Sequence, residues 1–543
     1  MSLRFTRFRF IVLFCALASA SLAPAQTVTT VDNPANSVAS QAKHYVVLVS
    51  LDGFRYDYPT KFGTPHLLAL GAAGASAPDG MLPSFPSLTF PNHITLVTGL
   101  YPEHHGIVAN SFRDPSRPGG TDGAENVYVY TQPSSNGDGT WYTGTPLWVL
   151  AEQQGMRSAC LFWPGSEAEI QGKRPSYYLK YDNTLDNHKR IDQVIAWLQL
   201  PPELRPHFIT LYYYDVDHFA HKTTPDSPET RDAVHKMDDL IGELHTRLDA
   251  LHLPIDLVVL ADHGMATVEP PSIALSDYSE LKDINAVGTL LYPASEAAAQ
   301  AAYEEFRKHP TDKFTAYRRA DLPAHLHMDQ NARIGDPVII ANGPYRIYPR
   351  PHGPGDPGEH GFDPTRFPQM KAIFFAAGPD IKPGIKLPTF ENIHVYPFIA
   401  KLLDLHTPIV DGKLQVLAPI LADVSIKVNM VKEPASERST LVPVSKDEPV
   451  KFGLGVTPPG ILHSAPLNYS KQASEAHLNG TVLLLVRVEA DGHPSRVTVL
   501  KGLGMGLDES AVKSVSESTF TPALKDGKPV VVEMKMEMSY QQQ

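Results

Sequence analysis

The chain has 543 residues, 42% of them hydrophobic, so it is too long for one ordinary domain and can form several buried cores. Its formal charge of -12 argues against general binding to nucleic-acid polymers or to anionic membranes. A phosphate-bearing substrate is still compatible with this charge, because a bound metal ion would change the local sign.

Residues 1–25 predict a signal peptide. Three arginines precede an apolar run over residues 10–20, and Ala23-Pro24-Ala25 offers a cleavage site. The apolar run is short for a bilayer span, so we expect a cleaved signal and a periplasmic or secreted protein. Cleavage would leave Cys160 as the one remaining cysteine, which excludes an intrachain disulfide.

The next part of the chain alternates between strand and helix patterns. Apolar runs predict strands at 44–51, 158–163, 207–214, 255–260 and 371–376, and helical spacing predicts helices at 64–74, 146–154, 187–198 and 230–251. This alternation predicts a doubly wound, mostly parallel α/β sheet in a domain of residues 44–424. The pattern breaks between about 267 and 350, where we expect an inserted α+β subdomain with a helix at 295–308.

The last part of the chain predicts a second, smaller domain. Residues 425–459 are rich in proline, serine and lysine, which is typical of a linker. Beyond it, residues 460–540 predict a small α+β unit. We expect its strands at 482–488, 495–500 and 530–538 and its helix at 508–518.

Acidic and histidine side chains follow the predicted strand ends of the first domain, and one more histidine lies in a glycine-rich loop. These residues are Asp52, Asp217, His221, Asp262, His263 and His360. Carboxylates and imidazoles without a thiolate suit two divalent ions, with zinc as the leading candidate. Two such ions a few Å apart can clamp a phosphoryl group.

Each of these residues also has a purely structural interpretation. Asp52 could belong to a turn, Asp217 could cap a helix, Asp262 and His263 could be a loop pair, and His360 could be a hydrogen-bonded loop histidine. Their joint occurrence along one sheet edge favours function. The other histidines that we weighed are predicted to be structural or solvent-facing, and they are His93, His104, His105, His218 and His352.

Thr89 is the candidate nucleophile. It precedes a short helix that we predict over 92–98, in which Pro91 suits the first turn and Gly99 ends the helix. The start of a helix favours an anion, and a threonine hydroxyl there can attack if its alkoxide is stabilised. Most strings of this type are only turns, so the prediction depends on the acidic and histidine residues described above.

Several strings resemble one known family in the expected order. They are SLDGFR at 50–55, TFPNH at 89–93, LVTGLYPEHHGIVAN at 96–110, ADHGM at 261–265 and GEHGFD at 358–363, together with the Asp217/His221 pair. The chain closely resembles the nucleotide pyrophosphatase/phosphodiesterases of the alkaline phosphatase superfamily, over roughly residues 44–420. The resemblance implies an alkaline phosphatase-type fold.

The resemblance also implies roles for the site residues. One zinc ion would be held by Asp217, His221 and His360, and the other by Asp52, Thr89, Asp262 and His263. Thr89 would be the nucleophile and would form a phosphothreonyl intermediate. Asn110 and the Thr89 backbone N–H would bind the phosphoryl oxygen opposite the metals.

An aromatic clamp for a nucleobase is implied as well. Phe90 would supply one ring and Tyr181 the other, with Tyr177 and Tyr178 as alternatives to Tyr181. Two features depart from the family pattern and leave the substrate preference open. Leu88 stands where vertebrate members often have lysine, and Asp215-Val216-Asp217 replaces the usual Glu-Pro-Asp.

Residues 476–529 resemble the C-terminal domain of TonB-like energy transducers. Strands of that fold can pair with a strand of a partner. A true transducer needs a membrane anchor and a long proline-rich spacer, and we expect neither here. We therefore interpret the tail as a module for an envelope protein partner or for self-association.

The sequence thus predicts an exported two-zinc phosphodiesterase that cleaves nucleotide phosphodiester or pyrophosphate bonds to nucleoside monophosphates. Two alternatives keep the same chemistry: an alkaline phosphatase-type phosphomonoesterase and a phospholipid head-group phosphodiesterase. A third alternative is an envelope interaction protein that acts through its tail.

Overall fold

The computed structural model forms two compact units, residues 1–425 and 426–543. It describes residues 27–117, 126–279, 284–309, 311–353 and 355–422, then 480–525 and 528–540 with short pieces between 449 and 478. The predicted signal peptide and nearly all of the predicted linker lie outside the described residues. In the described part of the chain, no helix combines the length and the apolar character needed to cross a bilayer.

A nine-stranded mixed sheet forms the centre of the first unit, in the order β1-β8-β7-β9-β2-β10-β19-β3-β20. Its strands in this order are Thr29–Thr30, Tyr177–Tyr178, Ser158–Leu161, Phe208–Tyr213, Tyr45–Leu51, Ile255–Leu260, Phe374–Ala377, Ala75–Ser76 and Ile385–Lys386. The five strands from β8 to β10 are mutually parallel, as the sequence predicts. β9, β2 and β10 are buried along their whole length, which explains their continuous apolar runs.

β19 pairs antiparallel with β10, with Phe374 opposite Leu260. The reason is topological: the chain reaches β19 from the loop that carries His360, and that loop lies at the edge where the parallel strands end. β19 therefore has to run back in the opposite direction. The predicted strand at 371–376 exists, but it begins three residues later than predicted.

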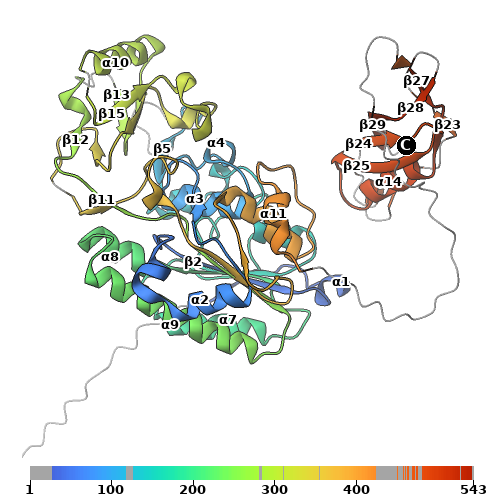
Figure 1. The fold of residues 1–543 in the computed structure, drawn as a ribbon, viewed down its shortest axis with the longest axis horizontal. Helices are drawn as coiled ribbons and strands as arrows, with labels where there is room; N and C mark the ends of the chain where they lie inside the picture. The colour runs from blue at the N-terminus through green and yellow to red at the C-terminus, as the bar shows by residue number, and fades with distance from the viewer. Residues whose placement is uncertain are drawn as a thin grey trace, which may run out of the picture. The chain divides into compact units, whose positions relative to one another are not determined.

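Helices cover both faces of this sheet (Figure 1). α2 (Pro65–Ala73), α7 (Asn187–Leu198) and α9 (Pro228–Asp249) lie on one side, and α3 (Thr89–Thr98) and α11 (Val395–Leu402) lie on the other. The remaining α-helices of this unit are α1 (Val38–Gln41), α4 (Pro102–His105), α5 (Pro133–Asn136), α6 (Leu147–Gln153), α8 (Asp215–Thr223), α10 (Glu296–Lys308) and α12 (Leu414–Leu417).

α9 begins two residues before its predicted start at Thr230. Ser227 is its N-cap, its hydroxyl accepts a hydrogen bond from the Thr230 N–H, and Pro228 is the first helical residue. This is a common helix-start arrangement, because a proline needs no hydrogen bond at that position.

A separate small core lies in the insertion. It is built on α10 and on paired short strands: β12 (Ile273–Ala274) with β17 (Ile347–Tyr348), β13 (Ile284–Val287) with β14 (Leu290–Pro293), and β15 (Phe314–Tyr317) with β16 (Val338–Ala341). The core residues are Ile273, Leu275, Leu291, Phe306, Phe314 and Ile339. Figure 1 shows these elements together at the upper left, beyond the side of the sheet that carries α3.

The second unit is a three-stranded antiparallel sheet with a packed helix. β24 (Gly480–Val488) lies between β25 (Pro494–Lys501) and β29 (Val532–Tyr540), and α14 (Leu507–Ser516) packs against β25 and β24. Val482, Leu484 and Val486 alternate inward along β24. Short strands complete the unit: β22 (Val456–Thr457), β23 (Ile461–His463), β26 (Thr519–Phe520), β27 (Ala523–Lys525) and β28 (Lys528–Val530).

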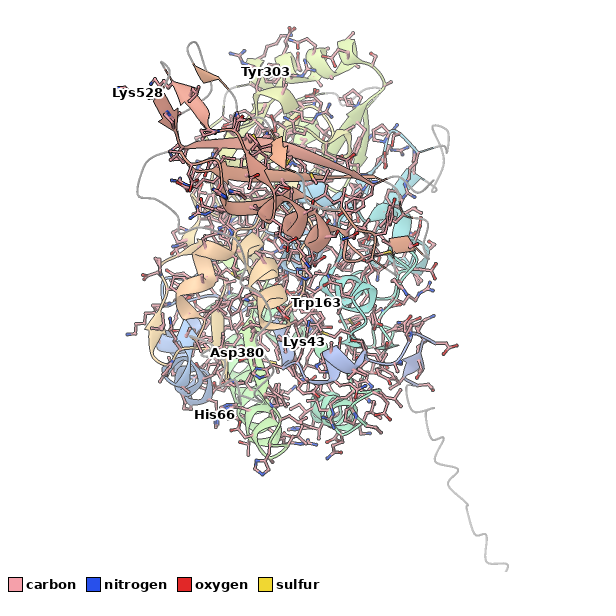
Figure 2. All side chains as sticks on the ribbon, turned by 90° about the vertical axis from the view of Figure 1, so that its right-hand side faces the viewer. Lys43, His66, Trp163, Tyr303, Asp380 and Lys528 are labelled. Atoms are coloured by element: carbon pink, nitrogen blue, oxygen red, sulfur yellow. The ribbon has the colours of Figure 1, made fainter. Side chains whose placement is uncertain are left out.

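The opposite end of β10 carries a buried carboxylate. Asp256 is fully buried, accepts a hydrogen bond from the Asp380 N–H (3.0 Å), and lies in one cluster with the side chains of Asp380 and His44. Figure 2 labels Asp380 and the nearby residue Lys43. Burial, reinforced by the charge of Asp380, raises the pKa of Asp256 to about 8.

We expect Asp256→Asn to stabilise the protein increasingly as the pH rises from about 4 to 8. In this window the natural unfolded chain loses the Asp256 proton while the folded chain keeps it, so natural stability falls by up to about 1.4 kcal/mol per pH unit. Urea unfolding of both proteins at pH 5, 7 and 9 measures this difference. Asp404→Asn, at an exposed partner of Lys43, is the control and should show no such trend. A constant difference between the Asp256 variant and the natural protein would contradict the prediction.

Candidate active site

Three neighbouring parallel strands deliver the acidic residues to one edge of the sheet. Asp52 directly follows β2, Asp262 is the second residue after β10, and Asp217 lies in the first turn of α8 after β9. Since β9, β2 and β10 are adjacent, side chains that are far apart in the sequence meet at their carboxyl ends. The loop after β18 (Gly358–Glu359) brings His360 to the same place.

Gly53 permits the close approach of α8 to β2. It adopts a left-handed conformation (φ +68°), and a Cβ atom there would lie 2.8 Å from the Asp217 Cα. The Asp217 N–H donates to the Asp52 carbonyl (3.1 Å), and the Gly53 N–H donates to the Asp262 carboxylate (3.3 Å). The Asp52-Gly53 turn therefore fixes the relative positions of all three carboxylates.

The residues form two adjacent groups, each with ligand atoms within 4.8 Å of one another: Asp217, His221 and His360 in one, and Asp52, Asp262 and His263 in the other. In the first group the two histidine Nε2 atoms lie 3.4 and 3.7 Å from the Asp217 Oδ1. In the second group the His263 Nε2 lies 3.5 Å from Asp52 and 2.9 Å from Asp262. The His263 and His360 rings stack at 3.7 Å, so the two groups adjoin.

Backbone carbonyls orient the three imidazoles. The Nδ1 of His221 lies 2.8 Å from the Gly358 oxygen, that of His360 lies 2.8 Å from the Ser87 oxygen, and that of His263 lies 2.9 Å from the Gly264 oxygen. Since a carbonyl can only accept, each Nδ1 carries a proton. Each Nε2 is then the atom that a metal ion can use.

The carboxylates lack enough partners within the protein. Among the described residues, the buried Oδ1 atoms of Asp52 and Asp217 have no hydrogen-bond partner. The buried Asp262 Oδ2 has no well-aligned hydrogen bond, although the His263 Nε2 lies 2.9 Å from it. Burial raises the pKa of Asp52 well above its usual value, and the charges of Asp262 and Asp217 raise it further. Burial likewise raises the pKa of Asp217. Buried oxygens of this kind fit one or two divalent cations, which would supply the missing positive charge.

The histidine pKa values shift in opposite directions. Burial opposes the protonated form of His263, but attraction to Asp262 outweighs it and raises the His263 pKa. Burial also opposes the ionised form of Asp262, yet His263 and His93 hold the Asp262 pKa well below its usual range. Burial lowers the pKa of His360 well below its usual value, with repulsion from His263 and His221 adding to the effect. His360 is therefore a neutral imidazole, the form that binds metal.

Thr89 lies beside the second group, the one formed by Asp52, Asp262 and His263. Its Oγ is 3.2 Å from the His263 Nε2, and it is the first residue of α3. The helix therefore starts three residues earlier than the predicted Asn92, with the extended Leu88 as its N-cap residue. The Asn92 side chain explains the tight turn, because its amide donates to the carbonyls of Pro86 and Leu88. The hydroxyl thus lies at the positive end of the helix.

Asn110 lies beside the nucleophile. Its amide oxygen accepts a hydrogen bond from the Phe90 N–H (3.0 Å). This contact uses the oxygen, so the NH₂ group of Asn110 is the part that can donate to a ligand.

The two predicted aromatic residues do not touch each other. Phe90 packs against Tyr130 at 5.2 Å between ring centroids, and Tyr181 packs against Phe162 at 5.4 Å. Tyr181 is 51% exposed. By contrast, the alternatives Tyr177 and Tyr178 are buried in β8, so neither offers a free ring face.

Two further residues support the site. His93 is structural, as the sequence predicts: it is buried, its Nδ1 donates to the Thr89 carbonyl (2.9 Å) and its Nε2 bonds to the Ser50 hydroxyl (2.8 Å). The second residue, Tyr212, is not predicted from the sequence. The Tyr212 hydroxyl donates to the Asp52 Oδ2 at 2.5 Å. The four-residue spacing of Thr89 and His93 on one helix was the available signal for the first. No local signal identifies the second.

Asp215, the departure noted in the sequence, faces away from the metal-ligand groups. Its carboxylate accepts hydrogen bonds from Asn187 and from Lys236, whose Nζ lies 2.7 Å away. These contacts tie α8 to α7 and α9.

Taken together, the site places a hydroxyl, an amide donor and two carboxylate–imidazole groups around one space. Such an arrangement can hold divalent cations, lower the pKa of an attacking hydroxyl and stabilise a phosphoryl group in displacement.

Comparison with known proteins agrees with this chemistry. The family model for type I phosphodiesterase/nucleotide pyrophosphatase matches residues 46–363, more than half of the chain. The model for the Gram-negative bacterial TonB protein C-terminal matches residues 465–541.

Similar proteins extend over most of the first unit. An uncharacterized pyrophosphatase/phosphodiesterase of Schizosaccharomyces pombe is 35% identical over 66% of this chain and 77% of its own length. Human ectonucleotide pyrophosphatase/phosphodiesterase family member 7 is 31% identical over 76% of this chain and 89% of its own length. Human family member 1 is 34% identical over 66% of this chain, a match that spans only 40% of that longer protein.

A solved structure shares the fold. An inactive variant of murine ectonucleotide pyrophosphatase/phosphodiesterase 5, in complex with AMP, superposes with a TM-score of 0.65 and 26% identity, and covers 70% of this chain and all of that one. These findings confirm the predicted fold, the predicted family and the TonB-like tail. The chain is a hydrolase of the nucleotide pyrophosphatase/phosphodiesterase family, joined to a TonB C-terminal-type domain.

Proposed function

We propose that the protein is a two-zinc phosphodiesterase that cleaves nucleotide phosphodiester or pyrophosphate bonds and releases a nucleoside monophosphate. One observation carries this proposal: the Thr89 hydroxyl, at a helix start, lies 3.2 Å from the ligand nitrogen of His263 in the second carboxylate–imidazole group. Asp217, His221 and His360 would hold one ion. Asp52, Asp262, His263 and Thr89 would hold the other.

When bound, the two ions lower the pKa of the threonine hydroxyl and neutralise charge that develops on the phosphoryl group. Thr89 Oγ attacks phosphorus, the ester oxygen departs with its electron pair and takes up a proton, and a phosphothreonine forms. Water then attacks the same phosphorus, the Thr89 oxygen leaves, and the monophosphate is released.

The surrounding residues position the substrate. The Asn110 amide and the Thr89 N–H would donate to the phosphoryl oxygen that faces away from the cations. The nucleobase would enter between Phe90 and Tyr181, where stacking tolerates different bases. The complex of AMP with the related murine protein supports a nucleotide as substrate.

Export and docking complete the proposal. The charged and apolar pattern of residues 1–25 supports release into the periplasm or the medium. The tail would bind an envelope protein or a second copy of itself. The interaction-only alternative is disfavoured because every expected ligand side chain is present at the site.

A substrate panel tests the reaction class. We expect the p-nitrophenyl ester of thymidine monophosphate to be hydrolysed with a kcat/KM at least tenfold above p-nitrophenyl phosphate and glycerophosphocholine. A monoesterase would need added cations beside Thr89, where Leu88 stands, and a head-group diesterase would need a choline cage. A preference for either of the other two substrates would reject the proposal.

Thr89→Ala should lower diester turnover by at least about a thousandfold, because the nucleophile is lost. Asn110→Ala should lower kcat by about 10²–10³-fold, the cost of removing one oxyanion donor. Circular dichroism of both variants controls for folding. Unchanged turnover by Thr89→Ala would show that another group attacks phosphorus.

Exhaustive chelation should abolish turnover and lower the melting temperature, since three carboxylates with buried, unpartnered oxygens lose their counter-charge. Adding zinc back should restore both properties. Elemental analysis should find two ions per chain in the natural protein and one in His360→Ala. Full activity in a protein freed of metal would refute the metal assignment.

Tyr212→Phe should weaken zinc binding by about 10–100-fold, because Asp52 loses the hydrogen bond that orients it. Tyr213→Phe is the matched control, since its hydroxyl bonds instead to the Asn187 carbonyl, away from the site. Competition with a zinc-binding dye measures both affinities. Equal affinities in the two variants would mean that the Tyr212 contact does not hold the ligand in place.

A further inference from the structure

A pocket of about 310 Å³ opens beside the proposed active site, and neither the family assignment nor the proposed chemistry accounts for it. It lies between the first unit's sheet-bearing core and the insertion of residues 267–350. Asn110 and His360 form its inner end, and the inserted strands β14 and β16 contribute its outer wall. Its volume lies at the small end of the range for small-molecule sites.

The position of the pocket identifies the part of a substrate that would enter it. In a displacement by Thr89, the leaving oxygen departs on the side of phosphorus opposite the attacking hydroxyl. Thr89 adjoins the group with His263, so the leaving oxygen points toward the group with Asp217, His221 and His360. His360 and its neighbour Glu359 line the pocket, whereas Phe90 and Tyr181 do not. The pocket is therefore on the leaving-group side.

Most of the large side chains that line the pocket are apolar. Leu88, the residue directly before the nucleophile, lines the pocket and packs against the Gly361 backbone. The other large side chains include Phe85, Val108, Met328, Ile340 and Phe362.

The charges at the pocket cancel each other. Among the described lining residues the one permanent cation is Arg346, whose guanidinium lies 2.8 Å from the Glu359 carboxylate and donates to the Gly358 carbonyl. A polyphosphate leaving group would thus bring two or more negative charges into the pocket, where an ion held with His360 could pair part of them and the described lining offers no unpaired cationic side chain. Such a transfer is unfavourable unless the charge is paired.

We propose that this pocket binds the leaving group and selects apolar, uncharged alcohols or phenols over anionic ones. The inference rests on the proposed function and narrows its substrate class to nucleotide diesters whose second ester group is neutral. Leu88 is the specificity-determining residue, because it directly precedes the nucleophile, lines the pocket and supplies no cation for a charged leaving group.

Two esters of the same nucleotide test this inference, the phenyl ester and the 4-sulfonatophenyl ester of AMP. They differ by one negative charge, and the sulfonate makes the phenol the better leaving group, so intrinsic reactivity works against our expectation. We expect the natural protein to hydrolyse the phenyl ester with a kcat/KM at least tenfold higher. Thr89→Ala, in which the esters persist, should bind them in the same order by calorimetry.

Two variants of one position supply the control. Leu88→Lys should reduce the preference for the phenyl ester at least tenfold, whereas Leu88→Met, which keeps an apolar side chain of similar volume, should preserve it. Equal or faster hydrolysis of the sulfonated ester by the natural protein, or an unchanged ratio in Leu88→Lys, overturns the inference alone. If the natural protein cleaves neither ester, the proposed function fails and the inference falls with it.

Discussion

The site depends on one electrostatic constraint: three carboxylates meet, and in the described part of the chain each has a buried oxygen with too few hydrogen-bond partners. The unpartnered oxygens of Asp52, Asp217 and Asp262 would each be costly if they stayed uncompensated. His263 compensates part of this charge, and its own pKa rises for that reason. Divalent cations held by these residues would compensate the remainder. The capacity to hold metal is thus built into the fold, because the same strands that form the core also carry the acidic residues.

The order of the strands explains why residues so far apart in the sequence share this site. β9, β2 and β10 are neighbours in the sheet, and the parallel direction places all three carboxyl ends at one edge. Gly53 then lets α8 approach closely enough for Asp217 to join Asp52. Supporting contacts also join residues that are distant in the sequence. Trp163, labelled in Figure 2, donates its indole N–H to the His93 carbonyl (3.0 Å). A local pattern therefore becomes a site only through long-range pairing.

The difference between local patterns and long-range pairing decides which features the sequence could predict. Buried strands such as β2 and β10 are continuous apolar runs, and the residue after such a run in a parallel sheet faces the ligand edge, so Asp52 and Asp262 were accessible to prediction. The start of α3 at Thr89 was predicted late, because side-chain contacts of Asn92 with the preceding loop decide it. Tyr212 was missed because its role depends on the pairing of β9 with β2. Contacts between distant segments leave no trace in local spacing.

The sheet carries the proposed catalytic residues, and the insertion contributes part of the pocket that would select the leaving group. The groups that would bind cations and attack phosphorus stand on strand ends and helix starts of the rigid sheet, where small displacements are costly. The outer wall of the leaving-group pocket comes instead from the insertion, where Met328, Ile334, Val338 and Ile340 pack into the main core. One contact links the two parts: Arg346 in that wall donates to the Gly358 carbonyl, which also accepts from the His221 Nδ1. Leu88 is the point where the two parts meet, since it precedes the nucleophile in sequence and faces the pocket in space. A single side chain at this position can therefore alter which ester group is accepted while the reaction at phosphorus stays the same.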